Sequence, residues 1–123
     1  MGEYLYEDLT EKIIGASFKV YNELGFGHRE KVYQRAHEAE YKEIGLSFKK
    51  ECPVRIFYKG RLIAKYYLDF LIEDKVVVEL KVANDFYTKD IKQILSYLKA
   101  NNYRLGLLII FNKDGVRVKR IIN

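Results

Sequence analysis

The stretch YYLDFLIEDKVVVELK, residues 66–81, decides the fold, because it contains two apolar, strand-forming runs joined by a short polar turn. Charges in such a turn face water and need no explanation. Asp69, Glu79 and Lys81, however, interrupt the apolar runs themselves. An unpaired buried carboxylate is so costly that it becomes protonated, pairs with a cation or binds a metal. The sequence therefore predicts a hairpin that carries a cluster of charged side chains.

The length of the turn decides whether the two carboxylates meet, because side chains alternate between the faces of a strand. A two-residue turn would leave Asp69 and Glu79 on opposite faces, whereas a three-residue turn would place them directly across from each other. Glu73 and Asp74 lack the glycine that two-residue turns favour, so we expect the longer turn. The pair could then share a divalent cation, or it could pair with Lys81 or a backbone amide in a structural network.

The hydrophobic pattern elsewhere predicts two helices before this hairpin, and a helix and two strands after it. The first helix has apolar residues at the spacing of one buried face and ends at Gly25, and we expect Gly15 within it to permit close packing. The second helix spans about residues 29–44, and a hairpin turning at Lys59 and Gly60 follows. Thr88 is the expected N-cap of the third helix.

The apolar run at residues 104–111 is typical of a strand covered on both faces, and residues 116–122 predict a last strand. The helix between residues 76–82 and 104–111 predicts a parallel crossover. We therefore expect an α/β (α+β) fold, with a mixed central sheet flanked by helices, and a single domain over residues 1–123.

The composition indicates a cytoplasmic protein without a membrane segment. Cys52 is the only cysteine, which excludes an internal disulfide and fits a reducing compartment. No apolar run approaches the roughly 20 residues that span a bilayer. The net charge of +5 suits a polyanionic partner. The basic residues lie in separate segments (48–50, 89–92 and 113–120), which would form a phosphate-binding surface only if the fold brings them together.

Several short motifs follow one another in an order that resembles the GxxExxY family, a group within the PD-(D/E)XK nuclease superfamily. The first motif is Gly27, Glu30 and Tyr33 at the spacing of the family's name. The second is Asp69, a short hairpin, and Glu79-x-Lys81, and the third is Gln93-x-x-x-Tyr97. His28 and Arg29 depart from the family, which tends to have apolar residues there. The resemblance spans nearly the whole chain.

The resemblance implies a restriction-endonuclease-like core and a Mg²⁺-dependent nuclease acting on DNA, in which Mn²⁺ can substitute. It implies that Asp69 and Glu79 bind the metal, with the backbone carbonyl of Leu80 and with Glu30 from an early helix. Lys81 would orient or deprotonate the attacking water, and Gln93 would lie near the site. Side chains expected to contact nucleic acid are Tyr33, Tyr97, Lys92, Lys119 and Arg120.

Two further expectations concern function and assembly. The alternative to an active nuclease is a catalytically silent module on the same fold that binds nucleic acid or a protein. A homodimer is also expected, because the first two helices carry more aromatic residues than one sheet face can cover, namely Tyr4, Tyr6, Phe18, Tyr21, Phe26 and Tyr41.

Overall fold

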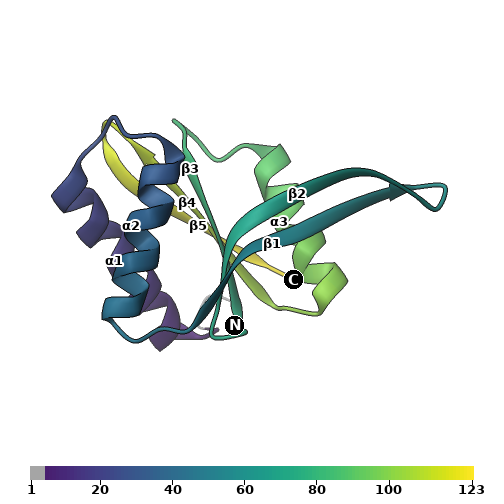
Figure 1. Cartoon of the computed structure of the whole chain (residues 1–123), viewed down its shortest axis with the longest axis horizontal. Coiled ribbons are helices and arrows are strands. Elements are labelled where there is room, and N and C mark those ends of the chain that lie inside the picture. The colour runs from purple at the N-terminus through teal and green to yellow at the C-terminus, as the bar shows by residue number, and fades with distance from the viewer. Residues whose placement is uncertain (1–4) are drawn as a thin grey trace.

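The computed structural model describes residues 5–123 and folds them around a five-stranded mixed sheet (Figure 1). Its elements are α1 (Glu7–Leu24), α2 (Glu30–Glu43), β1 (Phe48–Tyr58), β2 (Arg61–Ile72), β3 (Val76–Val82), α3 (Thr88–Asn101), β4 (Leu105–Asn112) and β5 (Gly115–Ile122). The strand order is β1-β2-β3-β4-β5, and only β3 and β4 run parallel. The predicted crossover through α3 is therefore confirmed. None of the described helices is long and apolar enough to cross a membrane.

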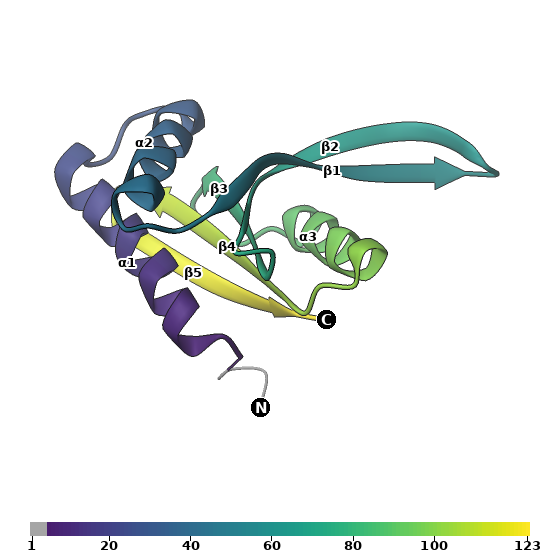
Figure 2. The same cartoon turned by 60° about the horizontal axis from the view of Figure 1, so that its bottom comes forward.

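Helices cover both faces of the sheet, as the α+β prediction requires. Figures 1 and 2 show α1 and α2 on one face and α3 on the other. Tyr33, Tyr41 and Phe70 belong to the apolar cluster under α1 and α2, while Ile94 and Leu98 of α3 pack in a second cluster on the opposite face. All eight residues of β4 are buried, which confirms that this strand is covered on both faces.

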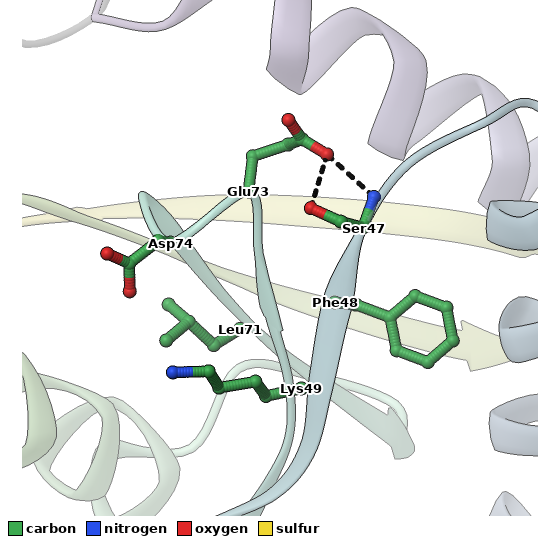
Figure 3. A pocket seen from close by; sticks show the side chains of 6 residues that line it. All are labelled: Ser47, Phe48, Lys49, Leu71, Glu73 and Asp74. Atoms are coloured by element: carbon green, nitrogen blue, oxygen red, sulfur yellow. Dashed lines mark hydrogen bonds between the residues drawn. The ribbon is translucent and has the colours of Figure 1, made fainter.

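The turn between β2 and β3 has the predicted three-residue length. Ile72 pairs with Val76, and both Glu73 and Asp74 adopt positive φ angles. Glu73 Oε2 accepts hydrogen bonds from the backbone N and the Oγ of Ser47, at 2.6 and 2.7 Å (Figure 3). These bonds lower the pKa of Glu73 and anchor the turn to the start of β1. A cavity of about 260 Å³ lies beside this turn.

The β1–β2 hairpin bends away from the sheet and projects past α3 (Figures 1 and 2). Phe70 lies in the cluster under α1 and α2, but Leu68, two residues earlier, lies in the cluster under α3. A regular strand would keep both side chains on one face, so β2 rotates between them. Glu51, opposite this point on β1, has a φ of 55°. The hairpin turn itself is at Lys59 and Gly60, as predicted, with positive φ at both residues.

Three sequence-based expectations need correction. Tyr87, not Thr88, is the N-cap of α3. Gly15 faces open space, so it does not serve close packing. Tyr41 is fully buried and Tyr21 donates to the carbonyl of Asn112, so these rings belong to the core rather than to an interface.

The homodimer, which was expected from the number of aromatic residues in the first two helices, consequently has weaker support. Tyr4 lies outside the described residues. Of the remaining aromatics in the first two helices and their connection, Phe18 and Phe26 are strongly exposed, at 45% and 54%. Two exposed rings are ordinary for a protein surface. The homodimer stays a prediction.

Gly106→Ala should destabilise the fold by about 1 to 3 kcal/mol, because the new Cβ would lie 2.5 Å from Cγ2 of Ile94 and overpack the contact between α3 and β4. Gly15→Ala is the matched control and should stabilise α1 by about 0.5 to 1 kcal/mol. Urea unfolding of both variants measures the difference. Equal stability of Gly106→Ala and the wild type would contradict this packing.

Candidate active site

Two carboxylates bridge β2 and β3 at the point where these strands separate. The last ladder pair is Phe70 with Val78, and the next two opposed residues are Asp69 and Glu79. The backbone N of Asp69 donates to Oε1 of Glu79 at 3.1 Å, and the backbone N of Leu80 donates to Oδ2 of Asp69 at 2.7 Å. Carboxylate oxygens thus take the place of the backbone carbonyls that would accept these hydrogen bonds in a regular sheet. The same bonds hold the two acids close together.

Helix α2 completes the hydrogen bonding of Asp69. Gln34 donates from Nε2 to Oδ1 of Asp69 at 2.9 Å, so both carboxylate oxygens accept a bond. Gln34 is not among the site residues predicted from the sequence. The available signal was its position four residues after Glu30, which places both side chains on one face of α2.

Lys81 extends the cluster toward α3. Its Nζ lies 3.7 Å from Oε2 of Glu79 and 4.0 Å from Oδ1 of Asp90. Asp90 is buried in the first turn of α3 and is likewise not among the site residues predicted from the sequence. An acidic residue in the first turn of a helix is ordinary, because it complements the helix dipole, so the sequence alone did not single it out.

Burial makes this cluster electrostatically unusual. Desolvation and the neighbouring charge of Asp69 raise the pKa of Glu79 to about 9. Desolvation also raises the pKa of Asp69, although hydrogen bonds oppose it. Burial and mutual repulsion therefore oppose full ionisation of the pair when no cation is present. Burial lowers the pKa of Lys81, but the carboxylates of Glu79, Glu30 and Asp90 outweigh it, so the net pKa lies above its ordinary value.

Glu30 lies further along β3 than the prediction required. Its Oε2 accepts a bond from the backbone N of Val82 at 3.3 Å. Among residues 5–123, no three His, Cys, Asp or Glu side chains gather closely enough to hold a metal. The predicted set of three carboxylates is therefore not assembled, because Glu30 bonds to the exposed end of β3 instead of the Asp69–Glu79 pair. The side chain of Leu80 lies in the core under α1 and α2.

Helix α3 carries Gln93 one turn after Asp90, where residues three apart share a face. This position places the partly buried Gln93 on the side of α3 that meets Lys81. Lys92 is exposed.

The two tyrosines expected to contact nucleic acid lie in the interior instead. Tyr33 is fully buried, donates to the carbonyl of Gly25 at 2.6 Å, and stacks on Phe111 with ring centres 4.6 Å apart. The prediction for Tyr33 is wrong, because no base can reach its ring. Tyr97 is 7% exposed and stacks on Tyr103, which leaves little of its ring for a partner.

Lys119 and Arg120 lie on opposite faces of the sheet. Lys119 opposes Leu108, which belongs to the cluster under α3, and is exposed. Arg120 opposes Leu107 on the α1 face, where its Nη2 donates to Oγ1 of Thr10 at 2.9 Å. These two residues, each expected to contact nucleic acid, therefore do not form one phosphate-binding surface.

Comparison with known proteins agrees with this architecture. Residues 7–121 match the family model described as the PD-(D/E)XK nuclease superfamily. The chain superposes on an alkaline exonuclease from Laribacter hongkongensis with a TM-score of 0.54 and 14% identity, covering 76% of this chain and 56% of the exonuclease. It superposes on SSO0001 with a TM-score of 0.58 and 18% identity, covering 98% of this chain and 61% of that protein. No match is found among curated protein sequences.

At these low identities the two likenesses show the fold alone, and the chain spans only 56% and 61% of the two proteins. The fold prediction is confirmed by them. The narrower resemblance to the GxxExxY group stays a prediction.

The raised pKa of Glu79 predicts that the metal-free protein loses stability as pH rises. An ordinary glutamate has a pKa of 4.5, and the folded value is about 9, so between these values the native state holds a proton that the unfolded chain has released. The free energy of unfolding in EDTA should therefore fall from about pH 5 to pH 9. Urea unfolding at several pH values measures this slope.

Glu79→Gln should flatten the slope, because the neutral amide no longer titrates. Glu23→Gln, at an exposed position of α1, is the control and should keep the wild-type slope. A wild-type stability that rises across this range would show that the pair is ionised in the folded protein.

Proposed function

Because the chain belongs to the PD-(D/E)XK nuclease superfamily, we propose that it is a metal-dependent nuclease that hydrolyses phosphodiester bonds of DNA. The observation that carries the proposal is the pair of buried carboxylates, Asp69 and Glu79, that oppose each other across β2 and β3 beside the ammonium group of Lys81. Two buried acids that face each other without a full countercharge are costly to maintain for structure alone. Such perturbed groups are concentrated at functional sites.

The residues present fit Mg²⁺, or Mn²⁺ in its place. Asp69 and Glu79, with the backbone carbonyl of Leu80, would hold the ion, because this metal prefers oxygen donors and retains several waters. The two carboxylates oppose each other and both have raised pKa values, so a cation between them would offset their charge. A bound Mg²⁺ would supply an activated water and neutralise charge on the phosphate.

Lys81 does not act as a general base in the proposed reaction. Its carboxylate neighbours raise its pKa, so it is an ammonium ion at neutral pH and has no free lone pair to accept a proton. We assign it to orienting the attacking water through a donated hydrogen bond and to offsetting negative charge that develops on the phosphate. Asp90 is assigned as a positioning residue, since its oxygen lies 4.0 Å from the ammonium group.

Two predicted residues take supporting tasks. Glu30 holds the exposed end of β3 through the Val82 amide and adds negative charge near Lys81. Gln93 presents an amide on the same side of α3 as Asp90, from which it can donate to a phosphate or a water.

One observation favours the alternative, a catalytically silent module that binds nucleic acid. Each oxygen of Asp69 already accepts a hydrogen bond, from Leu80 and from Gln34, as in a closed structural network. A metal must therefore compete with these donors or share the oxygens with them.

The proposal is tested by incubating the protein with single-stranded, duplex and branched DNA, and with single-stranded RNA, in Mg²⁺, Mn²⁺ or EDTA. Cleavage of DNA with either metal but not with EDTA is expected. Asp69→Asn and Glu79→Gln should lower the rate at least about a thousandfold, because each removes a charge that the metal requires.

Glu23→Gln, which changes an exposed glutamate of α1, is the control and should cleave at the wild-type rate. Far-ultraviolet circular dichroism verifies that each variant is folded. Metal-dependent cleavage by folded Asp69→Asn or Glu79→Gln at the wild-type rate would remove the basis of the assignment, as would the absence of cleavage by the wild type on every substrate.

Asp90→Asn should lower kcat by about tenfold with little change in KM, because the lysine loses a positioning partner rather than a substrate contact. The carboxylate of Asp90 raises the pKa of Lys81, so the basic limb of the pH–rate profile should move to lower pH in the variant. An unchanged profile would show that Asp90 serves only the packing of α3.

A further inference from the structure

The projecting part of the β1–β2 hairpin, residues 53–67, carries most of the net charge of the protein; we call it the arm. It contains Arg55, Lys59, Arg61 and Lys65 and no acidic residue. The rest of the chain has eighteen basic residues against seventeen acidic ones, and is therefore close to neutral. The arm therefore accounts for four of the five net positive charges, because acidic residues elsewhere in the chain balance the cations of segments 48–50, 89–92 and 113–120.

The arm also exposes large apolar side chains. Its strongly exposed members, between 43% and 61%, are Phe57, Tyr58, Leu62, Ile63, Tyr66 and Tyr67. The arm extends beyond α3 (Figure 2), and these side chains remain largely open to solvent. Large apolar side chains concentrated in this way on one projecting element indicate a binding surface rather than an ordinary protein surface.

Cations and aromatic rings alternate closely along the arm. Lys59 Nζ lies 5.4 Å from the ring centre of Tyr58, and Lys65 Nζ lies 5.3 Å from that of Tyr67. Cross-strand partners share a face, so Arg55 and Lys65 lie beside Pro53 and Tyr67 on one face of the arm. Surfaces that bind single-stranded nucleic acid combine the same two features, charges along the backbone and rings on which bases stack.

The inner side of the arm forms a groove with α3. This groove has a volume of about 340 Å³, and its lining includes Arg55 and Phe57 from the arm and Ser96 and Asn101 from α3. A cation, an exposed aromatic ring and polar side chains therefore line the same groove.

The arm leads directly to the candidate active site. Tyr67 precedes Asp69 by two residues on the same strand, and the arm begins where β2 leaves β3. From this base to its tip the arm spans about 20 Å. A strand that follows the arm therefore arrives at the carboxylate pair.

We propose that the arm binds the single-stranded part of a nucleic-acid substrate and guides it to the Asp69–Glu79 pair; this rests on the nuclease function proposed above. Phosphates lie along the four cations, and unpaired bases stack on the tyrosine and phenylalanine rings. Duplex DNA offers no free base faces to these rings, so the arm discriminates in favour of single strands.

The charge pattern argues against a second copy of the chain as the occupant. A two-fold contact between two arms would place eight cations together without a carboxylate from either arm. Like charges brought together in this way are strongly unfavourable. A polyanion has the complementary charge.

The test measures binding apart from cleavage, by fluorescence anisotropy with a labelled oligothymidylate of about 20 nucleotides in EDTA. The variant R55Q/K59Q/R61Q/K65Q should bind at least about tenfold more weakly, and its log–log salt slope should be shallower by about 3, since each lost phosphate contact removes about 0.7. Tyr67→Leu keeps the charge and should still lose about tenfold on single strands, with little change on duplex DNA.

The matched control is K12Q/K75Q/R104Q/K113Q, which removes the same charge from exposed positions outside the arm. It should keep the salt slope within about one unit of the wild type. Equal losses for the two quadruple variants would overturn the proposal, because net charge alone would then explain binding. The proposal would also be overturned if the arm variant binds as tightly as the wild type and light scattering shows a change from dimer to monomer. That result would identify the arm as an interface between copies of the chain.

A separate assay with bis(p-nitrophenyl) phosphate and Mn²⁺ distinguishes failure of this proposal from failure of the nuclease function. The arm variant should hydrolyse this small phosphodiester at the wild-type rate, because the carboxylate pair is intact. Binding through the arm without any hydrolysis by the wild type would support the arm and overturn the nuclease function. If the wild type hydrolyses the small phosphodiester but the arm variant binds the oligothymidylate as tightly as the wild type, the nuclease function would be supported and the role of the arm overturned.

Discussion

The separation of β2 from β3 is the constraint on which the rest of this structure depends. Backbone amides that leave a sheet must find other acceptors, because a buried N–H without a partner is costly. Here the amides of Asp69 and Leu80 bond to carboxylate oxygens, each supplied by the opposing strand. The local folding problem therefore places two acids face to face, in an arrangement that repulsion alone would prevent. The separation of the two strands thus produces both the charged cluster and the projecting β1–β2 hairpin.

That arrangement stores electrostatic free energy in a small volume. Burial and the charge of Asp69 raise the pKa of Glu79 and so favour its protonation, and a divalent cation can relieve the repulsion more fully, since it neutralises both charges. Lys81 does not quench the pair, because its ammonium group is shared between Glu79 and Asp90 at 3.7 and 4.0 Å. The lysine is thus held beside the acids by two ion pairs whose distances exceed that of a direct hydrogen bond.

The sequence predicted the elements and the register of the central hairpin, because strand alternation and a turn without glycine depend on local chemistry. It also predicted which acids would face each other. It did not predict the burial of Tyr33 and Tyr97, since a tyrosine on a helix satisfies either an apolar interior or a wet surface. The contributions of Gln34 and Asp90 depend on how α2 and α3 approach the sheet, which no local pattern encodes. The rotation of β2 near Asp69, which frees the hairpin, likewise arises only in the folded sheet.

The detachment of the arm has an evolutionary consequence. Beyond the separation point the two arm strands bond chiefly to each other, so residues can be inserted or deleted in pairs at the Lys59–Gly60 turn without altering the register around Asp69. By contrast, a single deletion in the turn that follows Ile72 would invert the face of every side chain in β3 relative to β2. The two ends of one strand therefore tolerate mutation very differently. Descendants of this chain can vary the length of the arm over generations while the carboxylate pair stays unchanged.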